Sequence, residues 1–195
     1  GSGGAPLAPA ASAGMFFAGM RLRIDRLFFR SWFGEGLRVQ ALATGARSLT
    51  AGIADGHRLE VTGQYDLALG RSVRLGVLGA GGTARVPDAL LTRIGGKPGF
   101  ATLPQQTLAA RDWWSLGVQA EAAFWRLRRA TFTALVFAEA GRYAREPGEW
   151  HAFYGPGIGV RLYLQRLALP AMGFNTGWNM ANGELCTGFA VGMQL

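Results

Sequence analysis

The serines and histidines of this sequence are its only candidates for nucleophilic catalysis. The candidates are three of the serines, Ser48, Ser72 and Ser115, and both histidines, His57 and His151. Acyl transfer needs a nucleophile beside its base, yet no Gly-x-Ser-x-Gly motif is present and both histidines fall in predicted loops. The single cysteine, Cys186, excludes an internal disulfide and a cysteine metal cluster. We therefore expect no catalytic site, no metal site and no cofactor.

A second set of side chains is charged and alternates with apolar residues along the chain. The members predicted to share one face are Arg38, Arg58, Glu60, Asp66, Arg74, Glu121, Glu139 and Arg161. Charged groups inside a protein persist only when they are paired, so this set predicts a network of ion pairs. A substrate path or a narrow pore lined by the same side chains is the alternative.

The chain has 195 residues and a net charge of +8, and almost all of its basic residues are arginine. A basic chain suggests nucleic-acid binding. These arginines, however, are interleaved with apolar residues at a period of two, which argues against nucleic acid as a partner.

Hydrophobic residues make up 49% of the chain and are spread over short segments. No run approaches the roughly 18 apolar residues of a membrane-spanning helix, and 30 glycines disfavour a helical bundle. In the final segment, 185–195, large apolar residues alternate with small or polar ones. That alternation is typical of a transmembrane β-barrel, whereas a soluble lipocalin-like barrel needs an apolar interior.

Eight segments repeat the alternation and predict an all-β, up-and-down antiparallel transmembrane β-barrel of about eight strands. They are 36–46, 57–69, 72–83, 113–125, 130–142, 155–166, 170–180 and 184–195. The connections between them are alternately tight and long, as in barrels with short periplasmic turns and long external loops. We therefore expect Asp88–Gln106, in the longest connection, to be an external loop. The residues expected to face lipid are Leu116, Val118, Ala120, Val136, Ile158, Val160, Leu162, Phe189 and Val191. Aromatic residues near predicted strand ends indicate a membrane-interface girdle.

The N-terminal region divides into two parts before the barrel, which we place at 33–195. Residues 1–14 are small and apolar or polar, and indicate a flexible terminus. Residues 15–32 fit either an amphipathic helix at the periplasmic face or an extra strand. We favour the helix, because an extra strand would make the number of strands odd, and the first strand would then begin on the external side of the membrane.

Five motifs in order resemble the Omp-eighty-five superfamily, the bacterial surface antigen barrels that include BamA, TamA and the two-partner-secretion transporters. They are WFGEGLRV (Trp32–Val39), IGGKPGF (Ile94–Phe100), VQAEAAF (Val118–Phe124), LVFAEAGR (Leu135–Arg142) and GPGIGVRLYL (Gly155–Leu164). The resemblance covers about residues 32–195. The chain resembles a short member of this superfamily, or the C-terminal barrel part of a member, without the POTRA domains that capture substrates in the family.

The resemblance also implies a contact inside the barrel. In the family, a long loop with an Arg-Gly-Phe/Tyr tip folds into the lumen and contacts the acidic residue of a Phe-x-Asp-x-Gly strand. Glu139 takes that acidic position here, but Pro98 stands where the family has arginine. We expect Glu139 to pair with Arg161 on the next strand, or else with Lys97 or a loop arginine, in a lumen charge network that includes Glu121.

The function implied by the resemblance is that of a non-enzymatic integral protein in the outer membrane of a Gram-negative bacterium. It would act in membrane protein or lipid insertion, in translocation, or as a membrane anchor. The alternatives are a small passive pore and the barrel of a larger outer-membrane lipase-type protein. The expected partners are the lipid bilayer and lipopolysaccharide, and a homodimer is left open.

Overall fold

The structure of the protein is a computed structural model. The residues described are 15–30, 32–49, 55–86, 91–96, 99–104, 108–164 and 170–191. Lys97 and Pro98 lie outside them, as does the flexible terminus predicted at 1–14. No helix of the described residues is long and apolar enough to cross a membrane.

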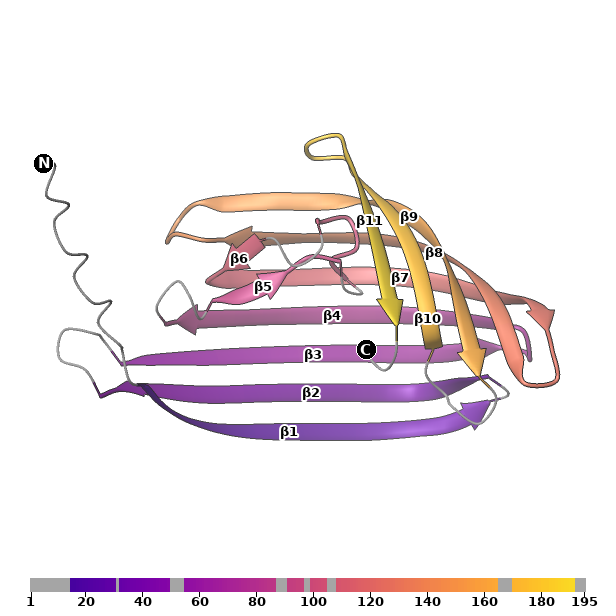
Figure 1. Ribbon diagram of the computed structural model, residues 1–195, viewed down its shortest axis with the longest axis horizontal. Helices are drawn as coiled ribbons and strands as arrows, with labels where there is room; N and C mark the ends of the chain where they lie inside the picture. The colour runs from indigo at the N-terminus through magenta and orange to yellow at the C-terminus, as the bar shows by residue number, and fades with distance from the viewer. Residues whose placement is uncertain are drawn as a thin grey trace, which may run out of the picture.

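Nearly all of the described residues belong to β-strands (Figure 1). The strands in chain order are β1 (Met15–Arg30), β2 (Phe33–Ser48), β3 (Gly56–Leu69), β4 (Val73–Arg85), β5 (Thr92–Ile94), β6 (Leu108–Ala110), β7 (Asp112–Arg126), β8 (Ala130–Ala144), β9 (Trp150–Leu164), β10 (Pro170–Asn179) and β11 (Glu184–Val191). Nine of them form one antiparallel sheet in the order β1-β2-β3-β4-β7-β8-β9-β10-β11, and β5 and β6 form a separate two-stranded hairpin. The all-β, up-and-down antiparallel prediction is therefore confirmed, and each of the eight predicted segments contains a strand.

The N-terminal segment is a strand, so the amphipathic helix that we favour there is wrong. β1 pairs with β2 along its whole length, from Met15 opposite Ser48 to Arg30 opposite Phe33. This register places Leu22 and Ile24 beside Ala41 and Val39 on one face, and Asp25 beside Arg38 on the other. The alternation of apolar and polar residues in β1 thus matches that of β2. The backbone hydrogen bonds between β1 and β2 favour a strand over the helix that the spacing of the same residues also allows.

The main sheet is strongly curled but not closed. β9, β10 and β11 bend in front of the other strands, and the β5–β6 hairpin lies within the curve (Figure 1). Trp32, just before β2, contacts Tyr163 near the end of β9 at a ring distance of 5.0 Å, although four strands separate β2 from β9 in the sheet. In the described residues, however, β1 and β11 each pair with a single neighbour. The expectation of a closed barrel with an even number of strands is therefore not met.

The two faces of the sheet differ in the way that the alternation predicts. On β9, Ile158 and Val160 are exposed on the convex face, whereas Phe153 and Tyr163 are buried on the concave face. Glycines on the concave face leave room for large neighbours. Phe137 lies directly opposite Gly157, where a Cβ atom would come within 2.0 Å of the Phe137 ring. The narrow interior is therefore filled by large side chains set against glycines.

Candidate functional site

A buried cluster of charged side chains occupies the concave face near the tight turns of the sheet. Its centre is Glu121 of β7, whose side chain is fully buried. Arg74 of β4 donates from Nη2 to Glu121 Oε2, and Arg161 of β9 donates from Nη1 to the same oxygen at 3.0 Å. Thr133 of β8 donates to the other oxygen, Oε1, and the Tyr163 hydroxyl lies 3.2 Å from Oε2. Side chains from three other strands therefore converge on this carboxylate of β7.

The cluster is balanced in charge. Asp66 of β3 lies with Oδ1 3.8 Å from Nε of Arg74, and its other oxygen accepts a hydrogen bond of 2.6 Å from Gln64. Glu121 and Asp66 thus face Arg74 and Arg161, two negative groups against two positive ones. Buried charges are tolerated in such an arrangement because each ion is desolvated against a partner of opposite sign.

Aromatic rings close the cluster off at the tight-turn end. Trp32, Phe33 and Tyr163 are each no more than 5% exposed and form one packed group. The guanidinium carbon of Arg74 lies 6.0 Å from the ring centre of Trp32 and 5.8 Å from that of Phe33. These rings exclude water from the ion pairs and add cation–π attraction to Arg74.

Part of the longest connection folds into the curve beside this cluster. Ile94, Phe100 and Leu103 of the connection are buried against Trp113 of β7 and Phe153 of β9. The ring of Phe100 lies 5.3 Å from that of Trp113 and 5.4 Å from that of Phe153. The described parts of Asp88–Gln106 are therefore mostly buried, in contrast to the exposed external loop that we expect from the sequence, because their apolar side chains fill the interior.

Glu139 of β8 binds this inward-folded connection. Its Oε1 accepts hydrogen bonds from the backbone N–H of Thr102 at 2.6 Å and from the Thr102 hydroxyl at 2.8 Å. Glu139 is 6% exposed and Thr102 is fully buried. The connection thus meets the acidic residue expected from the family pattern, but through Thr102. Lys97, the other expected partner, lies outside the described residues.

The expected pairing of Glu139 with Arg161 is wrong. The register of β8 and β9 places Gly155 opposite Glu139 and Arg161 opposite Thr133. Six residues separate positions 139 and 133, which is about 20 Å along a strand. Arg161 instead pairs with Glu121. Both residues point into the curve, but the register, which the alternation does not reveal, decides which inward charges meet.

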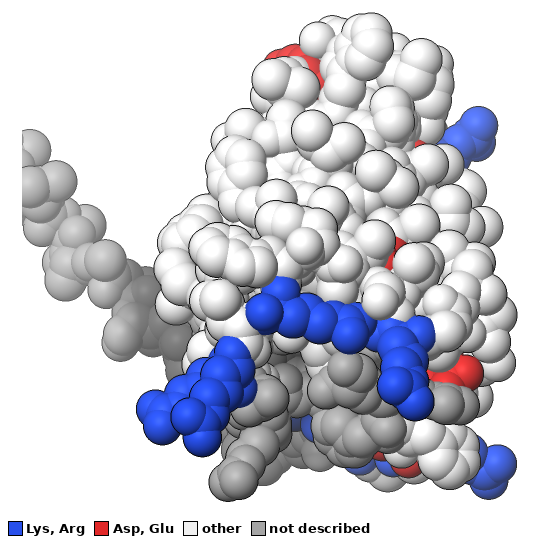
Figure 2. Space-filling model, turned by 90° about the vertical axis from the view of Figure 1, so that its right-hand side faces the viewer, with Lys and Arg blue, Asp and Glu red and all other residues white. Residues whose placement is uncertain are grey.

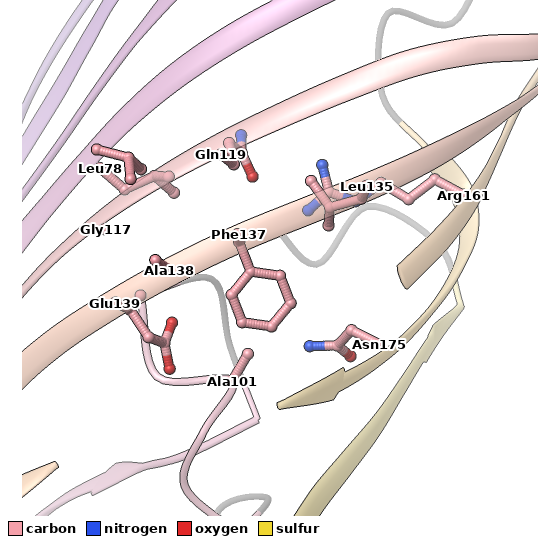
Figure 3. A pocket seen from close by; sticks show the side chains of 12 residues that line it. Leu78, Ala101, Gly117, Gln119, Leu135, Phe137, Ala138, Glu139, Arg161 and Asn175 are labelled. Carbon is pink, nitrogen blue, oxygen red and sulfur yellow. The ribbon is translucent and has the colours of Figure 1, made fainter. Parts of the chain in front are cut away.

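A small cavity separates the charge cluster from the connection. Its volume is about 30 Å³, room for about two water molecules. The lining includes Gln119, Glu139, Arg161 and Asn175, and the ring of Phe137 lies between Glu139 and Asn175 (Figure 3). The polar groups around it are suited to hold water, but the cavity is too small for an organic substrate.

The remaining predicted inward charges form smaller pairs along the concave face. Arg58 and Glu60 of β3 are 2.6 Å apart, and Glu60 accepts a hydrogen bond of 2.6 Å from Thr92 of β5. Arg38 of β2 lies 3.1 Å from Asp25 of β1. Sequence reasoning missed Thr92, Thr102 and Thr133 as members of these networks. Threonine carries no charge, and Thr92 and Thr102 lie in the long connection, where no alternation indicates which side chains point inward.

The candidate catalytic residues are not grouped. His57 and His151 are exposed at the long-connection end, and His151 stacks on Tyr143 at 5.4 Å. Ser115 is buried on the concave face, and its hydroxyl has no hydrogen-bond partner there. Ser72 lies in the β3–β4 turn, where it binds Arg126. Within the described residues, no three His, Cys, Asp or Glu side chains are arranged to hold a metal ion.

Weakening the contact between Thr102 and Glu139 is expected to release the connection from the interior. Thr102→Val removes the hydroxyl donor and leaves the buried carboxylate with fewer hydrogen bonds, at a cost of about 1–3 kcal/mol. Amide hydrogen exchange at 99–104 should then become faster than in the unaltered protein. Thr187→Val, at an exposed position of β11, is the matched control. Equal exchange in both variants would show that this contact does not hold the connection.

Comparison with known proteins does not assign a family. No family model matches the sequence, and neither a curated protein nor a solved structure matches it. The resemblance to the surface antigen barrels therefore rests on the sequence motifs.

Proposed function

We propose that this protein is a non-enzymatic integral protein of a bacterial outer membrane, of the surface-antigen type, which acts in insertion or translocation at the membrane. Its convex face would contact lipid, and its concave face would stay filled with ion pairs and the inward-folded connection. Anchoring of a larger protein is the second role that the same architecture would serve. The proposal rests on one observation above all, the apolar character of the convex face.

That convex face exposes large apolar side chains on every strand of the main sheet. One example from each strand, in sheet order, is Leu22, Leu37, Val61, Val77, Val118, Val136, Ile158, Phe174 and Phe189, and all are between 39% and 65% exposed. Soluble proteins rarely expose an apolar area of this extent. With the charge cluster around Glu121 buried on the concave face, the arrangement is the reverse of a soluble barrel, which has an apolar interior, and it fits a bilayer.

The filled interior argues against a passive pore. Between the charge cluster and the connection, the described residues leave a cavity of only about 30 Å³. Unpaired backbone groups at the two sheet edges, β1 and β11, would cost several kcal/mol each in a bilayer. Each edge therefore needs a partner there. This need supports a role in handling other chains or lipids. Exposed histidines and a buried Ser115 favour a non-enzymatic role.

Refolding experiments test this function. The chain is expected to fold only with detergent or lipid vesicles and to change its gel mobility on boiling. Solubility in plain buffer with unchanged mobility would contradict membrane insertion. In vesicles, the folded protein is expected to accelerate the insertion of a second outer-membrane barrel. A correctly inserted protein without such acceleration would favour the anchor.

A further inference from the structure

Two neighbouring turns at one end of the sheet carry a patch of arginines. The arginine rim, as we call it, consists of Arg71 in the β3–β4 turn and of Arg126, Arg128 and Arg129 at the β7–β8 turn. All four are exposed. No Asp or Glu occurs between 67 and 73 or between 122 and 132. Basic side chains gather on the face of the molecule that carries these turns (Figure 2).

The arginine rim is held in place by specific hydrogen bonds. Arg126 donates from Nη2 to the carbonyl oxygen of Arg71 at 2.6 Å and to the hydroxyl of Ser72 at 2.9 Å, which ties the two turns together. The N–H of Leu127 donates to the carbonyl oxygen of Ala130 at 2.8 Å and closes a tight turn. Arg128 and Arg129 occupy the tip of that turn. Their guanidinium groups are thus presented from a fixed backbone.

Aromatic side chains lie beside the arginine rim on the convex face. Phe124 and Trp125 are 62% and 55% exposed, and the pairing of β7 with β8 is irregular between Ala123 and Trp125. The Trp125 ring stacks on Phe132 at 5.3 Å. Tryptophan at the end of an apolar strand is typical of the lipid headgroup level. The arginine rim lies next to these aromatic side chains, on the side away from the apolar convex face.

We propose that the arginine rim binds the phosphate groups of anionic phospholipids at the membrane surface next to the tight turns. This inference rests on the proposed membrane function. Guanidinium groups form paired hydrogen bonds with phosphate, and the lipid chains would lie along Trp125 and Phe124. The opposite end of the sheet is less suited, because there an arginine is neutralised by a carboxylate, as in the pair of Arg85 with Asp112 at 3.0 Å. At the tight-turn end, the half-buried carboxylate of Glu35 accepts a hydrogen bond of 3.4 Å from the backbone N–H of Ala68. Anionic phospholipid would thereby fix the depth and orientation of the sheet.

The test uses the full chain in phosphatidylcholine vesicles that contain phosphatidylglycerol. Brominated forms of each lipid quench tryptophan fluorescence on contact, and the Trp125→Phe variant identifies the signal of Trp125. Brominated phosphatidylglycerol is expected to quench Trp125 more strongly than brominated phosphatidylcholine. In R128Q/R129Q this preference should fall about 25-fold, because each of the two basic groups near an anionic surface contributes about fivefold. R47Q/R142Q, which removes two exposed arginines at the other end, should keep it.

The remaining outcomes separate the two proposals. Absence of quenching by either lipid would overturn membrane insertion itself. Equal quenching by both lipids in the unaltered protein, or equal loss of preference in R128Q/R129Q and R47Q/R142Q, would overturn the arginine rim as a lipid site while leaving insertion intact. Loss of the preference on addition of inorganic phosphate at constant ionic strength would assign the arginine rim to soluble phosphate instead of lipid.

Discussion

Glu121→Gln is expected to lower the free energy of unfolding by about 3–5 kcal/mol, the cost of breaking a buried ion pair on one side. The amide removes the negative charge that balances Arg74 and Arg161, while both guanidiniums remain buried. It also turns the acceptor for Thr133 into a group that is partly a donor. Urea unfolding of the detergent-solubilised protein, followed by tryptophan fluorescence, measures the loss.

Two comparisons make the Glu121 result specific. Glu149→Gln, the same substitution at an exposed position before β9, should change stability by no more than about 0.5 kcal/mol. In double-mutant cycles with Arg161→Gln, Glu121→Gln should show a coupling of about 0.5–3 kcal/mol, and Glu139→Gln should be additive. A loss at Glu121 no larger than that at Glu149, or coupling of Arg161 to Glu139, would contradict the cluster as described.

The strands and their two faces were predictable from the sequence, because a strand places alternate side chains on opposite faces. Ile158 and Val160 point outward and Arg161 and Tyr163 point inward, as the alternation alone indicates. The segment 15–32 was ambiguous for a physical reason. Its apolar residues satisfy both a period of two and a period near 3.6, and only the pairing of β1 with β2 decides between them.

The contacts inside the curve were less predictable. The strand register decides which inward-pointing charged residues form ion pairs. The number of residues between positions 139 and 161 does not reveal that register. Arg161 lies opposite Thr133 and reaches Glu121 on the strand beyond, so that an ion pair skips a strand. The inward fold of the longest connection depends on Ile94, Phe100 and Leu103, which looked like loop residues because no alternation surrounds them.

Val118→Arg is expected to cost about 2–4 kcal/mol if the convex face lies in a bilayer. Val118 is 52% exposed near the middle of β7, between Val77 of β4 and Ala138 of β8. At an exposed position in water, an arginine would change stability by no more than about 0.5 kcal/mol. In the hydrocarbon, the guanidinium must be desolvated or must draw water and headgroups inward, and the folded state pays that cost. Unfolding by guanidinium chloride in phospholipid vesicles measures the difference.

A depth series on the same strand gives this prediction its control. Ala122 is exposed on the same face, four residues nearer to the tight-turn end, which is about 13 Å along the strand. Because the cost of a charge falls to about 0–1 kcal/mol near the membrane interface, Ala122→Arg should be far milder than Val118→Arg. Equal, small losses at both positions would mean that the convex face is surrounded by water. Equal, large losses would point to packing against protein, since only a bilayer makes the cost of the same arginine depend on its depth.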